Sequence, residues 1–308
     1  MIVGVSPAIR RALALAERYA RTRLSILIVG ATGTGKELFA QHIHERSGRP
    51  GPLVDVNCAA LPRDMVESLL FGHRRGAFTG AVDSTVGHIE RSDGGTLFLD
   101  ELASLPPEAQ GKLLRVLEQG EVQPLGAASK KRLDLRVVSS AQNDIGLLLR
   151  NGRFRQDLFQ RVTGVVIELP PLMARPEDVV PLAKHFAGLV GKNLEQRAEE
   201  VLLSYKWPGN VRELRHVVER AGELVTNCTI TFEAVAEGID LGAPGVWGGT
   251  EVAEWRKAAA ERADLMSLCE AEDGNASRIA QTLGIHRATL FRRLKRAGIS
   301  LRVLQESS

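Results

Sequence analysis

The stretch that decides the fold is Leu24–Lys36, with the sequence LSILIVGATGTGK. Its apolar beginning predicts a buried strand, and Glu37–Glu45 has the pattern of a helix. Gly30–Lys36, between them, has the spacing of a phosphate loop, whose glycines let backbone N–H groups turn inward around phosphate oxygens. By itself this segment also fits an ordinary glycine-rich turn between a strand and a helix. The functional interpretation assigns the nucleotide site to Gly30, Thr32, Gly33, Thr34, Gly35, Lys36 and Glu37.

A second motif, Thr96–Glu101 (TLFLDE), supplies two acids. Its apolar residues predict a strand that delivers Asp100 and Glu101 to its carboxyl end, where open α/β sheets bind ligands. Asp100 is then placed to orient Mg²⁺, directly or through its waters, and Glu101 to polarise an attacking water. Such a pair alone is usually just solvated, but together with a phosphate loop it predicts NTP hydrolysis. Many phosphate loops place Ser or Thr on the metal where this chain has Glu37, so metal binding should depend more on Asp100.

The rest of the first half alternates between two patterns. Leu53–Val56 and Leu135–Ser139 read as further buried strands, and Pro107–Glu118 reads as a helix. Strands that alternate with helices predict an α/β fold, with a parallel sheet covered on both faces.

The pattern changes after Pro170 and Pro171. From Asp178 to about Val235 it is wholly helical, which predicts a small lid rather than more sheet. Gly238–Gly249 is rich in glycine and reads as a linker. We therefore predict an α/β core at 1–170, a helical lid at 171–237, a linker at 238–251 and a helical C-terminal domain at 252–308.

Composition narrows the class of protein. The 308 residues are 44% hydrophobic and 25% charged, with a net charge of +3, which is ordinary for a soluble globular protein and no polycation. The three cysteines are far apart in sequence, so reduced thiols in a cytoplasm are expected. No apolar run approaches the ~20 residues of a membrane span. The Arg-rich stretch Ile9–Arg23 resembles a transit peptide in composition, but Glu17 interrupts its basic face and favours a surface helix.

The C-terminal end is locally basic. Gly274–Arg302 contains seven Arg or Lys and no Asp or Glu. Asn275 can cap a helix that runs to Leu283, Gly284 can end it, and a second helix should cover about Arg287–Arg296. Two short helices across a glycine turn, the second strongly basic, are typical of a helix-turn-helix.

This unit would bind double-stranded DNA, although a basic helix alone is more often a solvated face. Base or phosphate contacts are expected from Arg287, Thr289 and Arg292. Contacts to phosphate, or only to water, are expected from Arg293, Lys295 and Arg296. The small core should contain Ile279, Ala280, Leu283, Leu290 and Leu294.

Gly76–Ala81 spells GAFTGA. Together with GATGTGKE, NCAAL at Asn57–Leu61, GGTLFLDE and WPGNVREL at Trp207–Leu214, it makes the chain closely resemble the sigma-54-dependent transcriptional activators, from about Val3 to Leu301. The end of the chain also resembles the Fis-type domain found in many of these proteins. The resemblance implies a AAA+ P-loop ATPase with a helical lid, which uses ATP and Mg²⁺ in a ring, usually a hexamer. Its partners would be upstream DNA and RNA polymerase that carries sigma-54.

The resemblance also assigns residue roles. The loop of Gly76, Ala77, Phe78, Thr79, Gly80 and Ala81 would touch the sigma factor, with Phe78 and Thr79 as the contacting residues. Asn57 would be a switch that hydrogen-bonds Glu101. Arg155 and Arg161 would enter the neighbouring subunit's site, and Arg212 would sense the γ-phosphate from the same subunit.

Several positions depart from the family pattern. The family's sensor strand commonly ends in Ala-Thr-Asn, whereas this chain has Ser139–Asn143, SSAQN, with Gln142 at the sensor position. Leu69 replaces a usual acid, Ala31 likewise, and Met173 replaces a usual Arg. Two rival interpretations follow: another AAA+ machine such as a helicase or protease subunit, against which GAFTGA argues, and a DNA-binding regulator whose ATPase is weak or dead.

The position of the first motif leads to one more expectation. Family members often carry a sensor domain before the ATPase, but here the family-like Gly4–Pro7 begins almost at the first residue. A domain needs at least ~50 residues, so a chain that is naturally full length would have no built-in switch. Control would then come from expression level, an inhibitory partner or ring assembly.

Overall fold

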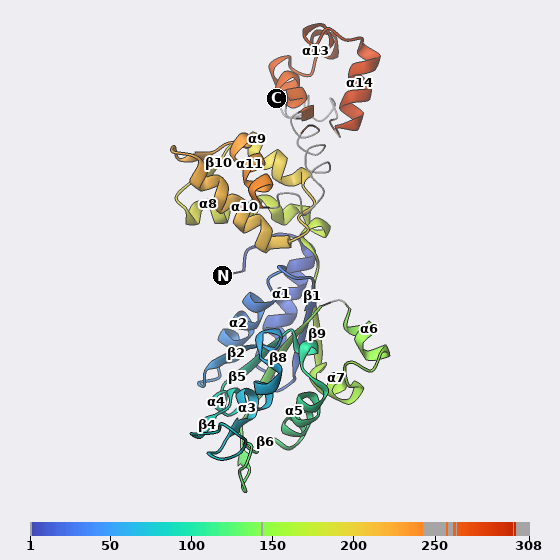
Figure 1. Cartoon of the computed structure of the whole chain (residues 1–308). Helices are drawn as coiled ribbons and strands as arrows, with labels where there is room; N and C mark the ends of the chain where they lie inside the picture. Colours follow the sequence, from blue (N-terminus) through green and yellow to red (C-terminus); the bar gives the residue numbers. More distant parts are fainter. Residues whose placement is uncertain are drawn as a thin grey trace. The chain divides into compact units, whose positions relative to one another are not determined.

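The computed structural model describes residues 2–142, 144–242, 257, 261–262, 264–297 and 299. The chain divides into two compact units. The first contains the residues up to Asp178 together with Pro208–Arg212, and the second contains Val179–Trp207 and the residues from Glu213 onward. Figure 1 shows the sheet of the first unit and the helices of the second.

The first unit is built on a five-stranded, fully parallel sheet with the strand order β2-β5-β8-β1-β9. The predicted strands are present, each with slightly different ends. Their bounds are β1 Ile26–Gly30, β2 Leu53–Asn57, β5 Thr96–Asp100, β8 Arg136–Ala141 and β9 Val165–Leu169.

Helices cover both faces of this sheet (Figure 1). Because side chains alternate along a strand, Ile26 and Ile28 pack with α1 and α2, whereas Leu27 packs on the opposite face with α3, α4, α5 and α7. The helices are α1 Pro7–Ala20, α2 Lys36–Ser47, α3 Val66–Phe71, α4 His88–Arg91, α5 Pro107–Gln119, α6 Ile145–Arg150 and α7 Gln156–Val162. The Arg-rich stretch near the start is therefore a helix that buries Ile9, Ala12 and Ala16.

Two small antiparallel pairs were not predicted from sequence. β3 (Gly72–His73) pairs with β4 (Thr85–Val86), and β6 (Glu121–Val122) pairs with β7 (Lys131–Arg132). Strands this short carry no readable alternation of apolar and polar residues, so their pairing depends on the surrounding structure.

The lid contains α8 Val179–Leu189, α9 Gln196–Ser204, α10 Asn210–Leu224 and α11 Phe232–Gly242. It is not wholly helical, since β10 (Asn193–Leu194) and β11 (Thr229–Ile230) form a parallel pair. α11 also continues into the predicted linker, because burial of Ile239 outweighs the roughly 1 kcal/mol that a helical Gly238 costs. The linker from residue 243 lies outside the described residues.

The C-terminal helices follow the sequence prediction closely. α13 spans Ala276–Thr282 and α14 spans Arg287–Arg296. The Asn275 side chain accepts hydrogen bonds from the N–H groups of Ser277 and Arg278, as a helix cap should. The predicted core residues are buried, except that Leu283 is partly buried, and Leu265 and Cys269 join them. Within the described residues, every helix is too short or too polar to cross a lipid bilayer.

Candidate active site

The candidate residues meet at the carboxyl edge of the sheet. Four neighbouring strands, β2, β5, β8 and β1, end at Asn57, Asp100, Ala141 and Gly30. Asn57 and Asp100 are paired in register. Strand order therefore gathers residues from four separate segments where parallel sheets bind ligands.

The phosphate loop has the backbone that its glycines predict. Gly33 and Gly35 have φ of 79° and 103°, in the left-handed region that side chains disfavour. A Cβ on Gly35 would meet nothing within 4 Å, so there is open space beside the loop at the start of α2. Backbone N–H groups at a helix start, next to open space, fit a phosphate group.

Lys36 lies over this loop and is buried. Its Nζ donates hydrogen bonds to the carbonyls of Gly30, at 3.0 Å, and Ala31, at 3.2 Å. Burial lowers the pKa of Lys36, while the charges of Asp100 and Glu101 act in the opposite direction. An anion bound in the loop would replace the two carbonyls as partner of the ammonium group and favour its charged form.

The acidic pair is held by a residue that the sequence interpretation missed. Ser140 Oγ donates to Asp100 Oδ1 at 2.5 Å and accepts a hydrogen bond from the Glu101 backbone N–H at 2.9 Å. Ser140 is fully buried at the end of β8, beside β5. Glu101 has φ of 52°, a left-handed conformation that costs about 1–2 kcal/mol for a residue with a side chain. Such strain is kept where the surrounding structure fixes it, and Ser140 is part of what fixes it.

Ser140→Ala is therefore expected to lower kcat for ATP about tenfold with little change in KM, because one orienting hydrogen bond is lost. The neighbouring Ser139 is the matched control. It is equally buried, and its hydroxyl has no hydrogen-bond partner in the described part of the chain. Steady-state turnover of both variants tests this, and equal kcat values would show that Ser140 does not position the acids.

The acids around Asp100 suit a divalent cation. Partial burial raises the pKa of Asp55, and the negative charges of Glu37 and Asp100 raise it further. The three carboxylates thus lie close enough to repel one another, and a nearby positive charge would favour their charged forms. No three His, Cys, Asp or Glu side chains among the described residues form a metal cage by themselves. Mg²⁺ commonly takes one or two carboxylates and completes its shell with phosphate oxygens and waters, and this site fits that arrangement through Asp100.

Asn57, the expected switch residue, ends β2, and Gln142, the expected sensor residue, follows the end of β8. Among the described residues, no hydrogen bond joins Asn57 to Glu101, because Asn57 Oδ1 instead accepts from the N–H groups of Ala59 and Ala60. Asn57 thus caps a short 3-10 helix, Cys58–Ala60. Gln142 is exposed just beyond β8, and Asn143 lies outside the described residues.

Arg155 and Arg161 are both exposed on α7 and the segment before it. Arg155 pairs with Asp157 at 2.7 Å, and Arg161 donates to the Leu117 carbonyl at 2.6 Å and 3.1 Å. The sequence interpretation missed Gln110, a fully buried residue of α5. Its Oε1 accepts from the Arg155 N–H and its Nε2 donates to the Arg153 carbonyl, which fixes the backbone that carries Arg155.

The GAFTGA loop connects β3 to β4 and exposes its centre. Phe78 is 44% exposed, with its ring 5.0 Å from that of His73, and Thr79 is exposed beside it. Ala81 is buried, because the loop closes on itself through a hydrogen bond from the Gly76 N–H to the Ala81 carbonyl. Ala81 was predicted to contact the sigma factor, and it instead forms the base of the loop.

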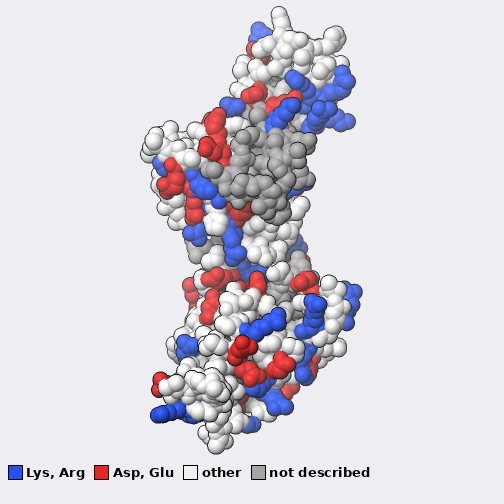
Figure 2. All heavy atoms as spheres, viewed as in Figure 1, with Lys and Arg blue, Asp and Glu red and all other residues white. Residues whose placement is uncertain are grey.

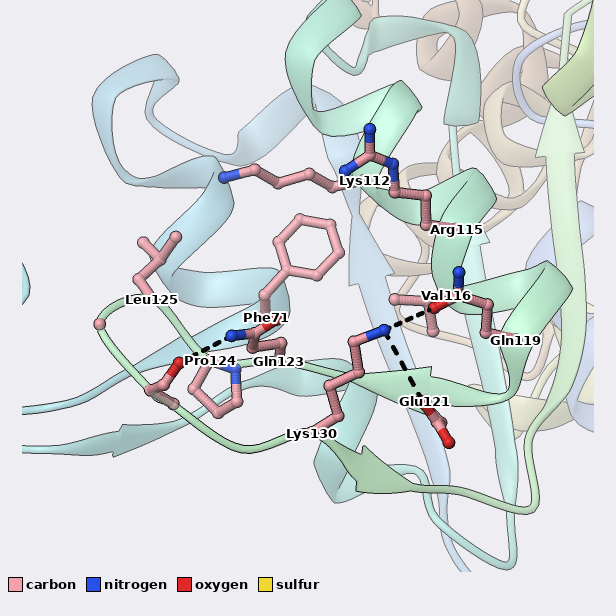
Figure 3. A pocket seen from close by; sticks show the side chains of 12 residues that line it. Phe71, Lys112, Arg115, Val116, Gln119, Glu121, Gln123, Pro124, Leu125 and Lys130 are labelled. Atoms are coloured by element: carbon pink, nitrogen blue, oxygen red, sulfur yellow. Dashed lines mark hydrogen bonds and ion pairs between the residues drawn. The ribbon is translucent and has the colours of Figure 1, made fainter.

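The β6–β7 connection braces this base. The Leu125 N–H donates to the Gly72 carbonyl, and the Leu125 carbonyl accepts from the Arg74 N–H. The same connection, Phe71 and α5 enclose a hollow of about 400 Å³. Figure 3 shows it, with Lys130 reaching Gln119 and Glu121. None of its lining residues belongs to the phosphate loop, so this hollow is separate from the candidate nucleotide site.

Arg212 lies beside the phosphate loop, and its expected role as a γ-phosphate sensor stays a prediction. Its backbone N–H donates to the Gly33 carbonyl at 3.3 Å, and its charge lowers the pKa of Lys36.

Figure 2 shows Lys and Arg gathered on the C-terminal helices. Arg287, Arg292 and Arg296 are exposed on α14. Thr289 is half-buried and accepts from Arg292 Nη2 at 3.4 Å. Arg293 forms an ion pair with Glu261 at 3.1 Å, so its charge is partly neutralised within the domain.

Comparisons with known proteins show the family of the chain. The model of the sigma-54 interaction domain matches residues 2–168, and that of the AAA+ ATPase lid domain matches residues 173–244. The chain belongs to the sigma-54-dependent transcriptional activators. Both the predicted family and the predicted AAA+ fold are thereby confirmed.

Relatives among the sigma-54-dependent activators cover much of the chain. The DNA-binding transcriptional regulator NtrC of Azospirillum brasilense is 44% identical over 76% of this chain and 50% of that protein. The nitric oxide reductase transcription regulator NorR1 of Cupriavidus necator is 40% identical over 96% of this chain and 63% of that protein. The chain thus spans between half and two thirds of the length of these two relatives.

Solved structures agree with this assignment. NtrX from Brucella abortus in complex with ADP has a TM-score of 0.72 at 32% identity and covers 97% of this chain and 70% of that chain. The Holliday junction branch migration motor RuvB of Thermotoga maritima has a TM-score of 0.53 at 18% identity, covering 96% of this chain and 88% of that chain, which shows a shared fold alone.

Proposed function

We propose that this chain hydrolyses ATP with Mg²⁺ to remodel RNA polymerase that carries sigma-54, and so activates transcription. The observation that carries the proposal is that one compact unit holds a phosphate loop, an acidic pair fixed by Ser140 and an exposed GAFTGA loop. A family relative, NtrX, has been solved in complex with ATP, which supports the choice of nucleotide.

Each residue of the site has a chemical task in this proposal. The loop N–H groups and Lys36 would hold the phosphates, and Asp100 would hold Mg²⁺, which would supply neutralisation of the phosphate charge. Glu101 orients the attacking water, and Arg212 senses the γ-phosphate from the same subunit. Gln142 offers an amide near the strand end for the sensor role, and Glu37 adds negative charge near Asp55.

Arg155 and Arg161 complete the site of a neighbouring subunit in a homo-oligomeric ring, which we propose is a hexamer. Their exposure supports this role, since both guanidinium groups are open to a partner. The Arg155–Asp157 pair lies at the surface, where ion pairs contribute little, so little opposes its exchange for a phosphate partner.

We also propose that the C-terminal domain binds double-stranded DNA upstream of the promoter, in the cytoplasm, through Arg287, Thr289 and Arg292. Arg293 and Arg296 would contact only phosphates. Because Arg293 forms an ion pair with Glu261, its contact with phosphate would be the weaker of the two. The chain then divides into an ATPase core, a lid extended to Gly242, a linker and this domain.

Thr79→Ala is expected to abolish open-complex formation while ATP turnover stays within about twofold of wild type. The reason is that Thr79 belongs neither to the phosphate loop nor to the acidic pair. Thr79→Ser keeps the hydroxyl and should retain most of the activation. The two measurements are promoter opening with sigma-54 RNA polymerase and phosphate release on the same protein. Full activation by Thr79→Ala would show that this loop does not contact the polymerase.

A further inference from the structure

Hydrogen-bond donors from distant parts of the chain hold the phosphate loop on one side, the side that faces Asn210 and Arg175, which we call its outer side. Three successive loop carbonyls are occupied. Thr32 O accepts from Asn210 Nδ2 at 2.9 Å, and Thr34 O accepts from Arg175 Nη2 at 3.2 Å. Between them, Gly33 O accepts from the Val211 N–H at 2.9 Å. All of these residues belong to the same compact unit.

Asn210 uses both ends of its side-chain amide. Nδ2 donates to Thr32 O, while Oδ1 accepts from the Leu172 N–H at 2.8 Å. The residue is 2% exposed and has φ of 55°, a left-handed conformation that asparagine tolerates better than most residues. The approach is close, because a Cβ on Gly33 would lie 2.3 Å from the Gly209 carbonyl oxygen. Asn210 therefore fastens the segment after β9 to the phosphate loop.

Arg175 makes a second connection from a buried position. It is 2% exposed, and its Nη1 lies 3.5 Å from Asp178 Oδ2. Asp178 is fully buried and accepts from the Ser6 N–H and the Ser6 hydroxyl, both at 2.7 Å. Because a buried charge needs a partner, Asp178 keeps the guanidinium group in place, and Arg175 links the start of α1 to Thr34.

The geometry of a trans peptide gives these contacts a consequence at the nucleotide. Within one peptide plane the carbonyl and the following N–H point in opposite directions. Holding Thr32 O and Thr34 O outward therefore turns the N–H groups of Gly33 and Gly35 toward the inner side of the loop. Inward N–H groups are the ones that receive phosphate oxygens.

We propose that Asn210 and Arg175 are positioning residues that pre-organise the phosphate loop by holding its carbonyls outward. The proposal rests on the proposed function, since it concerns the nucleotide of the same site. In this proposal both residues act through the loop backbone, because their side chains contact the loop carbonyls of Thr32 and Thr34. A loop that is already arranged loses less freedom when the phosphates bind, so its affinity is higher.

Asn210→Asp tests the first contact. Aspartate keeps the size of the side chain, its tolerance of the left-handed conformation and the acceptor for the Leu172 N–H, but it faces Thr32 O with an oxygen. We expect the dissociation constants of ATP and ADP to rise about tenfold, because a buried carbonyl loses its donor. Asn275→Asp is the matched control, since among the described residues that asparagine uses only its side-chain oxygen, as a helix cap.

Titration of the full chain with a fluorescent ADP analogue, competed by ATP, measures these constants. A merely structural role would lower the bound fraction at saturation and leave the dissociation constant unchanged. Arg175→Lys is the second variant. It keeps a positive charge beside Asp178 but loses the fork that reaches Asp178 and Thr34 together, so its dissociation constant should rise in the same direction.

The outcomes separate the two proposals. A wild-type chain that binds no nucleotide contradicts the proposed function itself. Wild-type binding together with weaker binding by either folded variant, and unchanged binding by Asn275→Asp, supports the positioning role. Dissociation constants within twofold of wild type in every folded variant overturn it.

Discussion

We expect Lys36→Ala to abolish nucleotide binding, so that ATP turnover falls below detection, a loss in kcat/KM of at least roughly 10²–10³. Lys36 supplies the ammonium group of the loop, and its Nζ lies within hydrogen-bond distance of two loop carbonyls. Alanine leaves the glycines that shape the loop backbone in place, but it removes the positive charge that would attract the phosphates. Promoter activation should be lost with it.

DNA binding should survive this change. The residues proposed to contact DNA lie on α14, in the other compact unit, so the affinity for DNA should stay within about twofold. Lys184→Ala is the matched control, because Lys184 forms a surface ion pair with Glu199 in the lid. Turnover and DNA binding are measured on the same preparations. Equal loss of both activities in folded Lys36→Ala would count against separate functional domains.

Arg155→Ala should lower ATP turnover by about 10³–10⁵, the range for an arginine that stabilises charge on a transferring phosphoryl group. The residue is exposed and contacts Asp157 rather than the phosphate loop of its own chain. Arg150→Ala is the control, since Arg150 is also exposed and bonds only the Gly146 carbonyl of its own helix among the described residues. If Arg150→Ala lost as much activity, the effect would not be specific to the proposed arginine.

Mixing two inactive proteins tests the trans arrangement directly. Lys36→Ala subunits keep Arg155, and Arg155→Ala subunits keep the phosphate loop, so a mixed ring contains complete sites at their boundaries. ATP turnover should reappear in the mixture, and wild-type turnover per subunit should climb steeply with concentration across a dilution series followed by sizing. A monomer with flat specific activity, or a mixture that stays inactive, would rule out an arginine supplied by a neighbour.

Motifs that are continuous in the sequence were predictable. Gly30–Lys36 contains the glycines and the lysine of the phosphate loop, and the strand and the helix that flank it follow directly on either side. The local sequence pattern is therefore enough to recognise this loop. The same holds for Thr96–Glu101 and for the capped helix after Asn275. The resemblance through GAFTGA and WPGNVREL added the family, which the comparisons confirm.

Predictions about which side chains are buried or hydrogen-bonded were harder to make, because they depend on contacts that the local sequence pattern does not show. Ala81 is adjacent to the exposed residues of its loop in sequence, yet closure of the loop buries it. Asn57 was expected to bond Glu101, but its oxygen is satisfied by the next turn of its own chain. The lid includes a strand pair of two residues each, too short for a sequence pattern to reveal.

The sequence by itself thus determined that the chain has a nucleotide-binding type of site. A phosphate loop, an acidic strand end and a helix cap are each formed by residues that are near neighbours in the chain, so a local pattern is enough to predict them. Only the tertiary structure decided what holds that site. Ser140 meets Asp100 because β8 lies beside β5, and Asn210 meets Thr32 across 178 positions of sequence. A serine or an asparagine has no fixed partner until the fold brings a buried donor or acceptor within reach. Once it is buried there, leaving that group unpaired costs about 1–3 kcal/mol, and this cost fixes the contact.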